Sequence, residues 1–162
     1  MKNDYKIGIG FDIHRLAENR NLIIGGVEIP FEKGLLGHSD ADVLVHAIID
    51  AILGAAGLPD IGTCFPDNDD SYKNIDSLIL LKKVHEKISE LNFEIVNIDS
   101  NIIAQAPKMA PYIQEMKQKI SETISIDTTQ ISIKAKTMEM LDSVGKGEGI
   151  SAQAVVLLKV EN

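Results

Sequence analysis

Five ionisable side chains of the kinds that bind metal ions lie at regular spacings in two otherwise apolar segments. They are Asp12 and His14, two residues apart, and Asp42, His46 and Asp50, four residues apart. Residues two apart share one face of a strand, and residues four apart share one face of a helix. Each spacing therefore directs its polar groups to one side of a single element, where groups from two elements can meet.

Asp12, His14 and His46 offer one carboxylate oxygen and two ring nitrogens to a single cation. A zinc ion held by three such ligands keeps a fourth position open, as in catalytic rather than structural zinc sites. Burying ionisable groups without partners is costly, so the polar stripe on the helix should face a cation, a cavity or water. The alternative is an ordinary solvated helix face. The strand pair favours the cation site, whereas Asp42 and Asp50 are expected to be structural or to support the ligands.

Hydrophobic patterning predicts the elements that position these residues. Strands are expected over 5–14, 93–105, 131–137 and 150–160, with two short strands around Gly25 and Gly26 over 22–30. Helices are expected over 40–56, capped by Ser39 or Asp40, over 76–91, burying Leu78, Leu81, Val84, Ile88 and Leu91, and over 111–125. Loops are expected over 60–74 and 138–149. This order predicts one α+β domain over 1–162, a mixed β-sheet with helices on one face. The apolar last strand suggests an oligomer, although burial within one chain explains it equally well.

Composition narrows the range of partners and compartments. The chain has 162 residues, of which 44% are apolar, and carries a net charge of −8. This charge disfavours non-specific binding to nucleic acid or to an anionic membrane. No apolar run reaches the length of a membrane span, and the N-terminal residues lack a signal-peptide core. The single cysteine, Cys64, cannot form an internal disulfide, so we expect a reducing, cytoplasmic location.

Three further segments could bind an anionic ligand. His38 and Ser39 lie where the first long helix is expected to begin, and free N–H groups at a helix N-terminus attract phosphate. Lys108 occupies a turn between two prolines, although an ordinary exposed lysine would explain it as well. Thr137 and Glu139 follow a strand end, where a carboxylate could hold Mg²⁺ beside phosphate oxygens. No P-loop, dinucleotide fingerprint or nucleophile–histidine arrangement is apparent.

Stretches spread over nearly the whole chain resemble the 2-C-methyl-D-erythritol 2,4-cyclodiphosphate synthase family. They are FDIH (11–14), GGVEIPFEKGLLGHSDADVLVHAIIDAILGAAGLPDIGTCFPD (25–67), NIDSNIIAQAPKM (97–109) and GKGEGISAQAVVLL (145–158). The resemblance implies a ferredoxin-like fold, assembled as a homotrimer with active sites between neighbouring subunits around an apolar central channel. It also implies a reaction of non-mevalonate isoprenoid biosynthesis. In that reaction the 2-phosphate of 4-diphosphocytidyl-2-C-methyl-D-erythritol 2-phosphate attacks its own β-phosphate, which forms the cyclic diphosphate and releases CMP.

The resemblance further implies roles for individual residues. The implied cation ligands are Asp12, His14 and His46 for Zn²⁺ or another divalent cation, and Glu139 for Mg²⁺ or Mn²⁺ bound with the diphosphate. His38 and Thr137 fall where the family stabilises the transition state. The implied substrate contacts are Asp12, His14, His38, Ser39, Asp60, Ile61, Gly62, Phe65, Asp69, Ala104, Lys108, Met109, Ala110, Lys136, Thr137, Glu139 and Lys146. The cytidine pocket corresponds to residues 104–110 and 136–139 of the neighbouring subunit.

The sequence departs from the family pattern near its C-terminal end. Lys136 stands where the family commonly has threonine, and residues 142–146 replace a Gly-Phe-Thr-Gly-Arg segment that lines the trimer channel. Lys146 keeps the charge of the arginine but loses its bidentate fork. Two other functions stay open. One is a zinc hydrolase that uses the open coordination position for water, and the other is a nucleotide-binding trimer without activity.

Overall fold

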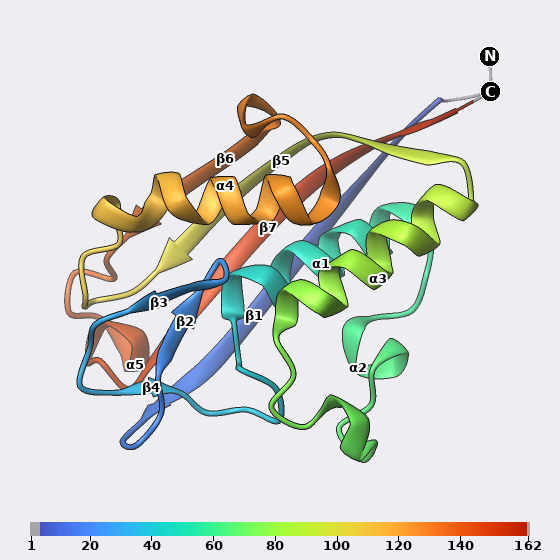
Figure 1. The fold of residues 1–162 in the computed structure, drawn as a ribbon. Coiled ribbons are helices and arrows are strands. Elements are labelled where there is room, and N and C mark those ends of the chain that lie inside the picture. The colour runs from blue at the N-terminus through green and yellow to red at the C-terminus, as the bar shows by residue number, and fades with distance from the viewer. Residues whose placement is uncertain (1–3, 162) are drawn as a thin grey trace.

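The computed structural model describes residues 4–161 as a five-stranded sheet with helices packed against one face (Figure 1). In spatial order the strands are β4 (Gly34–Leu35), β1 (Tyr5–Ala17), β7 (Gly149–Val160), β5 (Phe93–Ile103) and β6 (Ile131–Lys136). Strands β5 and β6 are parallel, and the other neighbouring strands are antiparallel. The predicted mixed sheet of an α+β fold is therefore confirmed.

Three long helices cover the buried face of this sheet (Figure 1). They are α1 (Val43–Ala56), α3 (Ser77–Glu90) and α4 (Ile113–Ile124). The remaining elements are the hairpin of β2 (Leu22–Ile24) and β3 (Val27–Ile29), the short helices α2 (Ile61–Cys64) and α5 (Asp142–Gly145), and the 3₁₀ turns Asp70–Tyr72, Ala110–Tyr112 and Thr128–Gln130. Helix α1 has a buried side chain at nearly every position, so it forms the centre of the core.

Two glycines allow α1 to lie unusually close to β1. A Cβ atom added at Gly8 would lie 2.0 Å from the Ala51 carbonyl oxygen, and one added at Gly10 would lie 1.9 Å from the Ala47 carbonyl oxygen. Any side chain at either position would therefore push the helix away from the strand. Residues 8, 10, 12 and 14 of β1 share one face, because side chains alternate along a strand. The close approach thus brings the polar end of this face against α1.

The opposite face of β1 is apolar and exposed. Its alternate side chains are between 47% and 73% exposed, and they are Tyr5, Ile7, Ile9, Phe11 and Ile13. Val155 of the neighbouring strand β7 adds a further exposed apolar side chain. An apolar sheet face of this extent is typical of an interaction surface in a folded protein. Among residues 4–161, no helix combines the length and the apolar character that crossing a membrane requires.

Several predicted boundaries differ from those observed. Helix α1 begins at Val43, and its cap is Asp42 rather than Ser39 or Asp40, because the Asp42 carboxylate accepts the Val45 N–H at 3.1 Å. The predicted loops contain the short helices α2 and α5. Leu91, which was expected to point inward from the second helix, follows the end of α3 and is 46% exposed.

Candidate active site

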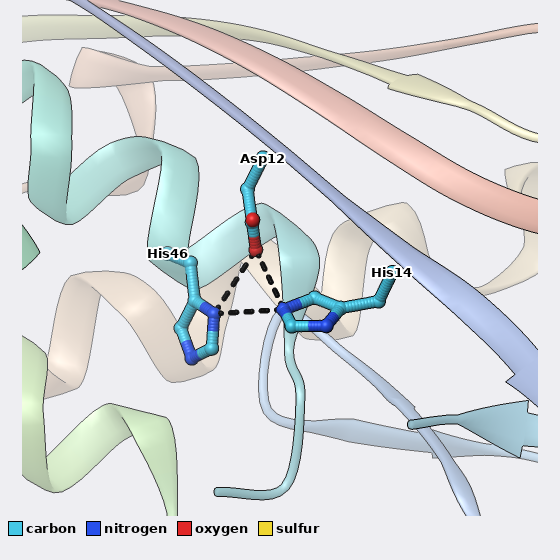
Figure 2. Close-up of side chains that lie close together, drawn as sticks. All are labelled: Asp12, His14 and His46. Atoms are coloured by element: carbon cyan, nitrogen blue, oxygen red, sulfur yellow. Dashed lines mark hydrogen bonds and ion pairs between the residues drawn. The ribbon is translucent and has the colours of Figure 1, made fainter. Parts of the chain in front are cut away.

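The three predicted cation ligands converge at one point between β1 and α1 (Figure 2). The Asp12 Oδ2 atom lies 2.9 Å from His14 Nε2 and 3.0 Å from His46 Nδ1. The two histidine nitrogens lie 3.3 Å apart. Asp12 and His14 come from the α1-facing side of β1, and His46 comes from the second turn of α1. The predicted convergence of a strand pair with a helix residue is therefore confirmed.

These distances fit the edges of a coordination tetrahedron. Zinc bonds of about 2.0–2.1 Å to nitrogen and oxygen place neighbouring ligand atoms about 3.3 Å apart. The residues offer one carboxylate oxygen and two imidazole nitrogens, all within 4.8 Å of one another, so they could hold a divalent cation. Zinc suits this donor set, and several other divalent ions share it.

The outward ring nitrogens of both histidines have hydrogen-bond partners of their own. His14 Nδ1 lies 2.9 Å from the Leu36 carbonyl oxygen, which can only accept, so this nitrogen carries the proton. In the neutral ring the lone pair is then on Nε2, the atom that faces the cluster and could bind a cation. His46 Nε2 lies 2.8 Å from Ser77 Oγ and 3.2 Å from Ser39 Oγ. Hydrogen bonds of this kind fix ring orientation and tautomer in metal-binding histidines.

The charges within the cluster favour an ionised carboxylate. Burial would raise the pKa of Asp12, but its hydrogen bonds to His14 and His46 and their charges outweigh this effect and hold the pKa well below its usual range. Burial would lower the pKa of His14, but its hydrogen bond to Asp12 and the charge of Asp12 raise it overall. Asp12 is thus ionised over the whole physiological pH range, and its negative charge favours a cation in the space between the rings.

The cluster forms one wall of a cavity of about 230 Å³. The predicted site residues that line the cavity are Asp12, His14, His38, Ser39, His46, Ile61, Gly62 and Phe65. The lining residues that sequence reasoning did not identify are Gly37, Asp67, Tyr72 and Leu80. The cavity is therefore bounded by the end of β1, the segment before α1, the short helix α2 and the turn that follows it.

His38 and Ser39 reach the cavity from a loop and not from the open end of a helix. Helix α1 begins at Val43, after this loop, and the Asp42 carboxylate accepts one of its first N–H groups, so phosphate binding at this helix start stays a prediction. His38 Nε2 lies 3.3 Å from the Asp69 carbonyl oxygen across the cavity mouth. The Ser39 hydroxyl oxygen accepts the Ala41 N–H at 3.1 Å.

Two predicted substrate contacts, Asp60 and Asp69, cap short helical turns near the rim. The Asp60 carboxylate accepts the Thr63 N–H at 2.8 Å, and the Asp69 carboxylate accepts the Ser71 N–H at 2.9 Å. Hydrogen bonds from these residues lower the pKa of each carboxyl group. Neither side chain lines the cavity, so their contact with substrate stays a prediction.

The two other carboxylates of the helix stripe do not join the cluster. Asp42 is fully buried and accepts the N–H groups of Gly25 at 2.9 Å and Gly26 at 2.6 Å, which ties the β2–β3 turn to α1. Asp50 accepts the Ile61 N–H at 2.7 Å and so anchors the start of α2. The structural roles expected for both residues agree with these contacts.

The other predicted site residues gather at the ends of the parallel strands β5 and β6. We call residues 104–110 and 136–139 the β5–β6 corner. The Ala104 N–H donates to the Lys136 carbonyl oxygen at 2.9 Å, which joins the two segments. The Thr137 hydroxyl donates to Glu139 Oε1 at 2.7 Å. Met109 is buried under the corner, whereas the side chains of Lys108, Ala110, Lys136, Thr137 and Glu139 are exposed or half-buried, as is Lys146 at the end of α5.

Within one chain the β5–β6 corner does not meet the cation cluster. Asp12 pairs with Ala152, Ala152 with Ile102, and Ile102 with Ala135. Three strand spacings therefore separate β1 from β6 at this level, a distance of about 14 Å. The corner contributes no residue to the lining of the cavity. The predicted site residues thus form two separate groups in a single subunit.

Sequence reasoning missed Ser77, which lies behind His46. Ser77 is fully buried, and its hydroxyl group contacts the His46 ring. The sequence signal was weak, because a serine beside Asp76 at a helix start is typical of a cap region. Asp76 is the cap of α3, accepting the Leu78 N–H at 2.8 Å.

Comparison with known proteins identifies the chain's relatives. A family model described as the YgbB family matches residues 5–159. A protein of Caldicellulosiruptor bescii is 62% identical over 154 residues, which cover 95% of this chain and 98% of that protein. A protein of Clostridium acetobutylicum is 60% identical over 153 residues, which cover 94% and 99%. Both carry the name 2-C-methyl-D-erythritol 2,4-cyclodiphosphate synthase.

Solved structures agree with this relationship. The structure of IspF from Plasmodium falciparum in complex with CDP matches with a TM-score of 0.87 and 39% identity, covering 100% of both chains. The bifunctional IspDF from Campylobacter jejuni matches with a TM-score of 0.94 and 44% identity, covering 98% of this chain and 43% of that longer chain. Because the family model spans nearly the whole sequence and the curated relatives are more than half identical, this chain belongs to the YgbB family.

Proposed function

We propose that this chain is a 2-C-methyl-D-erythritol 2,4-cyclodiphosphate synthase. It converts 4-diphosphocytidyl-2-C-methyl-D-erythritol 2-phosphate to the cyclic diphosphate and CMP. An oxygen of the 2-phosphate bonds to the β-phosphorus, and the bond from that phosphorus to the oxygen of the α-phosphate breaks. The leaving CMP keeps that oxygen, and an eight-membered ring closes. The observation that carries the proposal is the Asp12, His14 and His46 cluster in the wall of a cavity, in a chain of this family.

The chain supplies positioning and charge more than proton transfer. The attacking phosphate is already largely ionised near neutral pH, since the second pKa of a phosphate monoester is about 6. The main barriers are the mutual repulsion of anions and the ordering of a flexible substrate. A divalent cation at the cluster would supply Lewis-acid polarisation of a phosphate oxygen. His38 and Ser39, on the same cavity wall, would donate hydrogen bonds to the phosphate oxygens and stabilise the transition state.

The segment 61–69 would separate the reacting groups from water. Ile61, Gly62 and Phe65 line the cavity, and the Phe65 ring packs against Tyr72 with its centroid 5.4 Å away. Water is the competing nucleophile in any phosphoryl transfer, and an apolar wall lowers its local concentration. Asp60 and Asp69, at the rim of this segment, would bind the hydroxyl groups of the methylerythritol.

The cavity is too small for the whole substrate. Pockets that enclose a drug-sized ligand typically measure about 300–1,000 Å³, and the cytidine diphosphate ester is at least that large. The cavity of about 230 Å³ would hold the methylerythritol phosphate end. The cytidine would then bind at the β5–β6 corner of a second copy, because the corner of the same chain lies about 14 Å away across the sheet. There Glu139 would bind Mg²⁺ or Mn²⁺ with the diphosphate, and Thr137 would contact a phosphate oxygen.

A homotrimer would bring these two groups together. The exposed side chains on β1 form an apolar face that water contacts unfavourably, and three such faces can bury one another around a central channel. The chain would then complete each active site at the border of two subunits. The assignment of the sheet to the ferredoxin-like folds is part of the same proposal.

One experiment tests the proposed reaction directly. The purified chain is incubated with substrate, Zn²⁺ and Mg²⁺, and CMP and the cyclic diphosphate are quantified by chromatography. We expect both products in equal amounts. The variant His46→Ala should lose bound zinc and lower turnover by more than about 10²-fold, because it removes one of the three proposed ligands, and even partners that only support a ligand change metal affinity or activity by about 10- to 100-fold. The variant His85→Ala, two turns beyond Ser77 in α3, is the matched control and should retain zinc and turnover.

Two results would contradict the proposal. Hydrolysis of the substrate or of a simple ester without ring formation would instead identify a zinc hydrolase. Binding of CDP without turnover, in protein that contains both cations, would identify a nucleotide-binding protein.

A further inference from the structure

A chain of hydrogen bonds runs from the cation cluster into the protein behind it. His46 Nε2, on the side of the ring away from Asp12, lies 2.8 Å from Ser77 Oγ. The Ser77 hydroxyl in turn donates a hydrogen bond to Asp40 Oδ1. The three residues come from α1, from the first turn of α3 and from the segment before α1. Ser77 is fully buried and does not line the cavity, so it cannot reach a substrate.

The donors around Asp40 fix the direction of this chain. Asp40 Oδ2 accepts the Ser77 N–H at 3.0 Å, and Oδ1 accepts the Asp42 N–H at 3.1 Å. A carboxylate that faces several N–H donors acts as an acceptor only. The single hydroxyl hydrogen of Ser77 must therefore point to Asp40. The Ser77 oxygen is then left to accept, so the proton between Ser77 and His46 belongs to His46 Nε2.

The position of that proton decides what His46 offers to the cluster. A neutral imidazole that carries its proton on Nε2 has its lone pair on Nδ1. His46 Nδ1 is the atom that lies 3.0 Å from Asp12 Oδ2 and 3.3 Å from His14 Nε2. The opposite tautomer would direct an N–H group into the space that a cation must occupy.

We propose that Ser77 and Asp40 are positioning residues that hold His46 in the Nε2–H tautomer and fix its ring plane, so that Nδ1 is presented to a divalent cation. The inference rests on the proposed cation site and deepens it. Neither residue touches the cation or the substrate; both act through His46. Partners of this kind typically change metal affinity by about 10- to 100-fold when they are removed.

Ser39 contributes less to the orientation of His46 and has a different task. Its hydroxyl oxygen lies 3.2 Å from His46 Nε2, which is longer than the 2.8 Å contact of Ser77. Ser39 lines the cavity, whereas Ser77 does not. With the His46 proton accepted by Ser77, the hydroxyl hydrogen of Ser39 is available to an oxygen of a ligand in the cavity.

The test measures zinc affinity rather than turnover. The dissociation constant of Zn²⁺ is determined by competition with a chromophoric chelator for the wild-type chain and for Ser77→Ala, Asp40→Asn and Ser100→Ala. Ser100 is the matched control, because it is also a buried serine whose hydroxyl donates to a protein oxygen, that of Ser132 at 3.0 Å. We expect Ser77→Ala and Asp40→Asn to bind zinc about 10- to 100-fold more weakly, and the control to match the wild type.

A second measurement needs no variant. In the zinc-loaded wild-type protein labelled with ¹⁵N-histidine, the His46 Nε2 proton should give a distinct NMR signal that exchanges slowly with water, because it is buried and donated to Ser77. Rapid exchange of this proton would overturn the inference, as would wild-type zinc affinity in both Ser77→Ala and Asp40→Asn. Failure of the wild-type chain to bind zinc would instead overturn the cation site itself, and the inference with it.

Discussion

The cation cluster and the β5–β6 corner are built in contrasting ways. Asp12 and His14 sit on a strand with neighbours on both sides, and His46 sits on the most buried helix of the protein. Both histidine rings are held by further hydrogen bonds outside the cluster. At the corner, by contrast, Thr137 and Glu139 follow the end of an edge strand, and both are exposed.

The backbone of the β5–β6 corner is also less regular than that of the cation cluster. Glu139 and the following Met140 have φ angles of 50° and 65°, in the left-handed region that non-glycine residues seldom adopt. The exposed turn is held by few contacts, among them the bond from the Met140 N–H to Gln105 Oε1 at 3.3 Å. A preorganised cluster can bind a cation within one chain, whereas an open turn becomes specific only when substrate or another subunit covers it. The difference predicts that the two groups respond differently to the loss of assembly.

Breaking the proposed trimer should have the largest effect. Ile9 is 73% exposed on the apolar face of β1, so the substitution Ile9→Glu leaves the folded monomer intact. In a trimer the new carboxylate would be buried without a partner, at a cost of about 3–5 kcal/mol. We expect a monomer by light scattering that keeps its zinc affinity but loses turnover by at least about 100-fold.

The matched control is Ile79→Glu, because Ile79 is an exposed isoleucine on helix α3, on the other side of the sheet. This variant should remain a trimer with normal turnover. An active monomeric Ile9→Glu variant would show that one chain is sufficient and would remove the need for a second copy.

Changing the corner itself should have an intermediate effect. The substitution Glu139→Gln removes the negative charge proposed to bind Mg²⁺ but keeps a side chain of the same shape. We expect turnover at limiting Mg²⁺ to fall by about 10- to 100-fold, and zinc affinity to stay unchanged. The measurement is a Mg²⁺ titration of CMP release. Glu90→Gln, at the end of α3, is the control, and an unchanged Mg²⁺ response in Glu139→Gln would count against the assignment.

Substitution of Asp50 should have the smallest effect, and it tests whether this residue belongs to the cation cluster. It shares the helix stripe with His46, yet its carboxylate accepts the Ile61 N–H at 2.7 Å and so holds the cavity wall. The substitution Asp50→Ala should lower the free energy of unfolding by about 1 kcal/mol and raise KM about 3- to 10-fold, as expected for one lost hydrogen bond. Zinc affinity should not change. If the Asp50→Ala variant bound zinc tenfold more weakly, Asp50 would have to be counted among the residues that bind the cation.

Much of the fold follows from local sequence signals. The alternation along 93–105 and the mostly apolar segment 40–56 predicted β5 and α1 within a few residues. The predicted helix boundaries were less accurate where several neighbouring side chains could cap the same helix. Ser39, Asp40 and Asp42 are all good caps, and only the packing of Asp42 under the β2–β3 turn decides which one caps α1.

As with the fold, part of the candidate site could be predicted from the sequence: the cation ligands could, but the residues that support them could not. The spacing of Asp12, His14 and His46 indicated a shared ligand set before any fold was known. The helix spacing by itself does not distinguish His46 from Asp42 and Asp50, because a periodicity cannot tell which turn of a helix lies opposite a strand. Ser77 carried no recognisable signal, since its role depends on two residues more than thirty positions away.

The sequence by itself determined which side chains share a face, because the periods of helices and strands follow from backbone geometry alone. It also determined the glycines that allow β1 and α1 to approach each other, and the chemistry of the donor atoms. Only the tertiary structure decided that Asp12, His14 and His46 meet while Glu139 stays three strands away. Distances between elements depend on packing and on the order of strands in the sheet, and no local pattern encodes either.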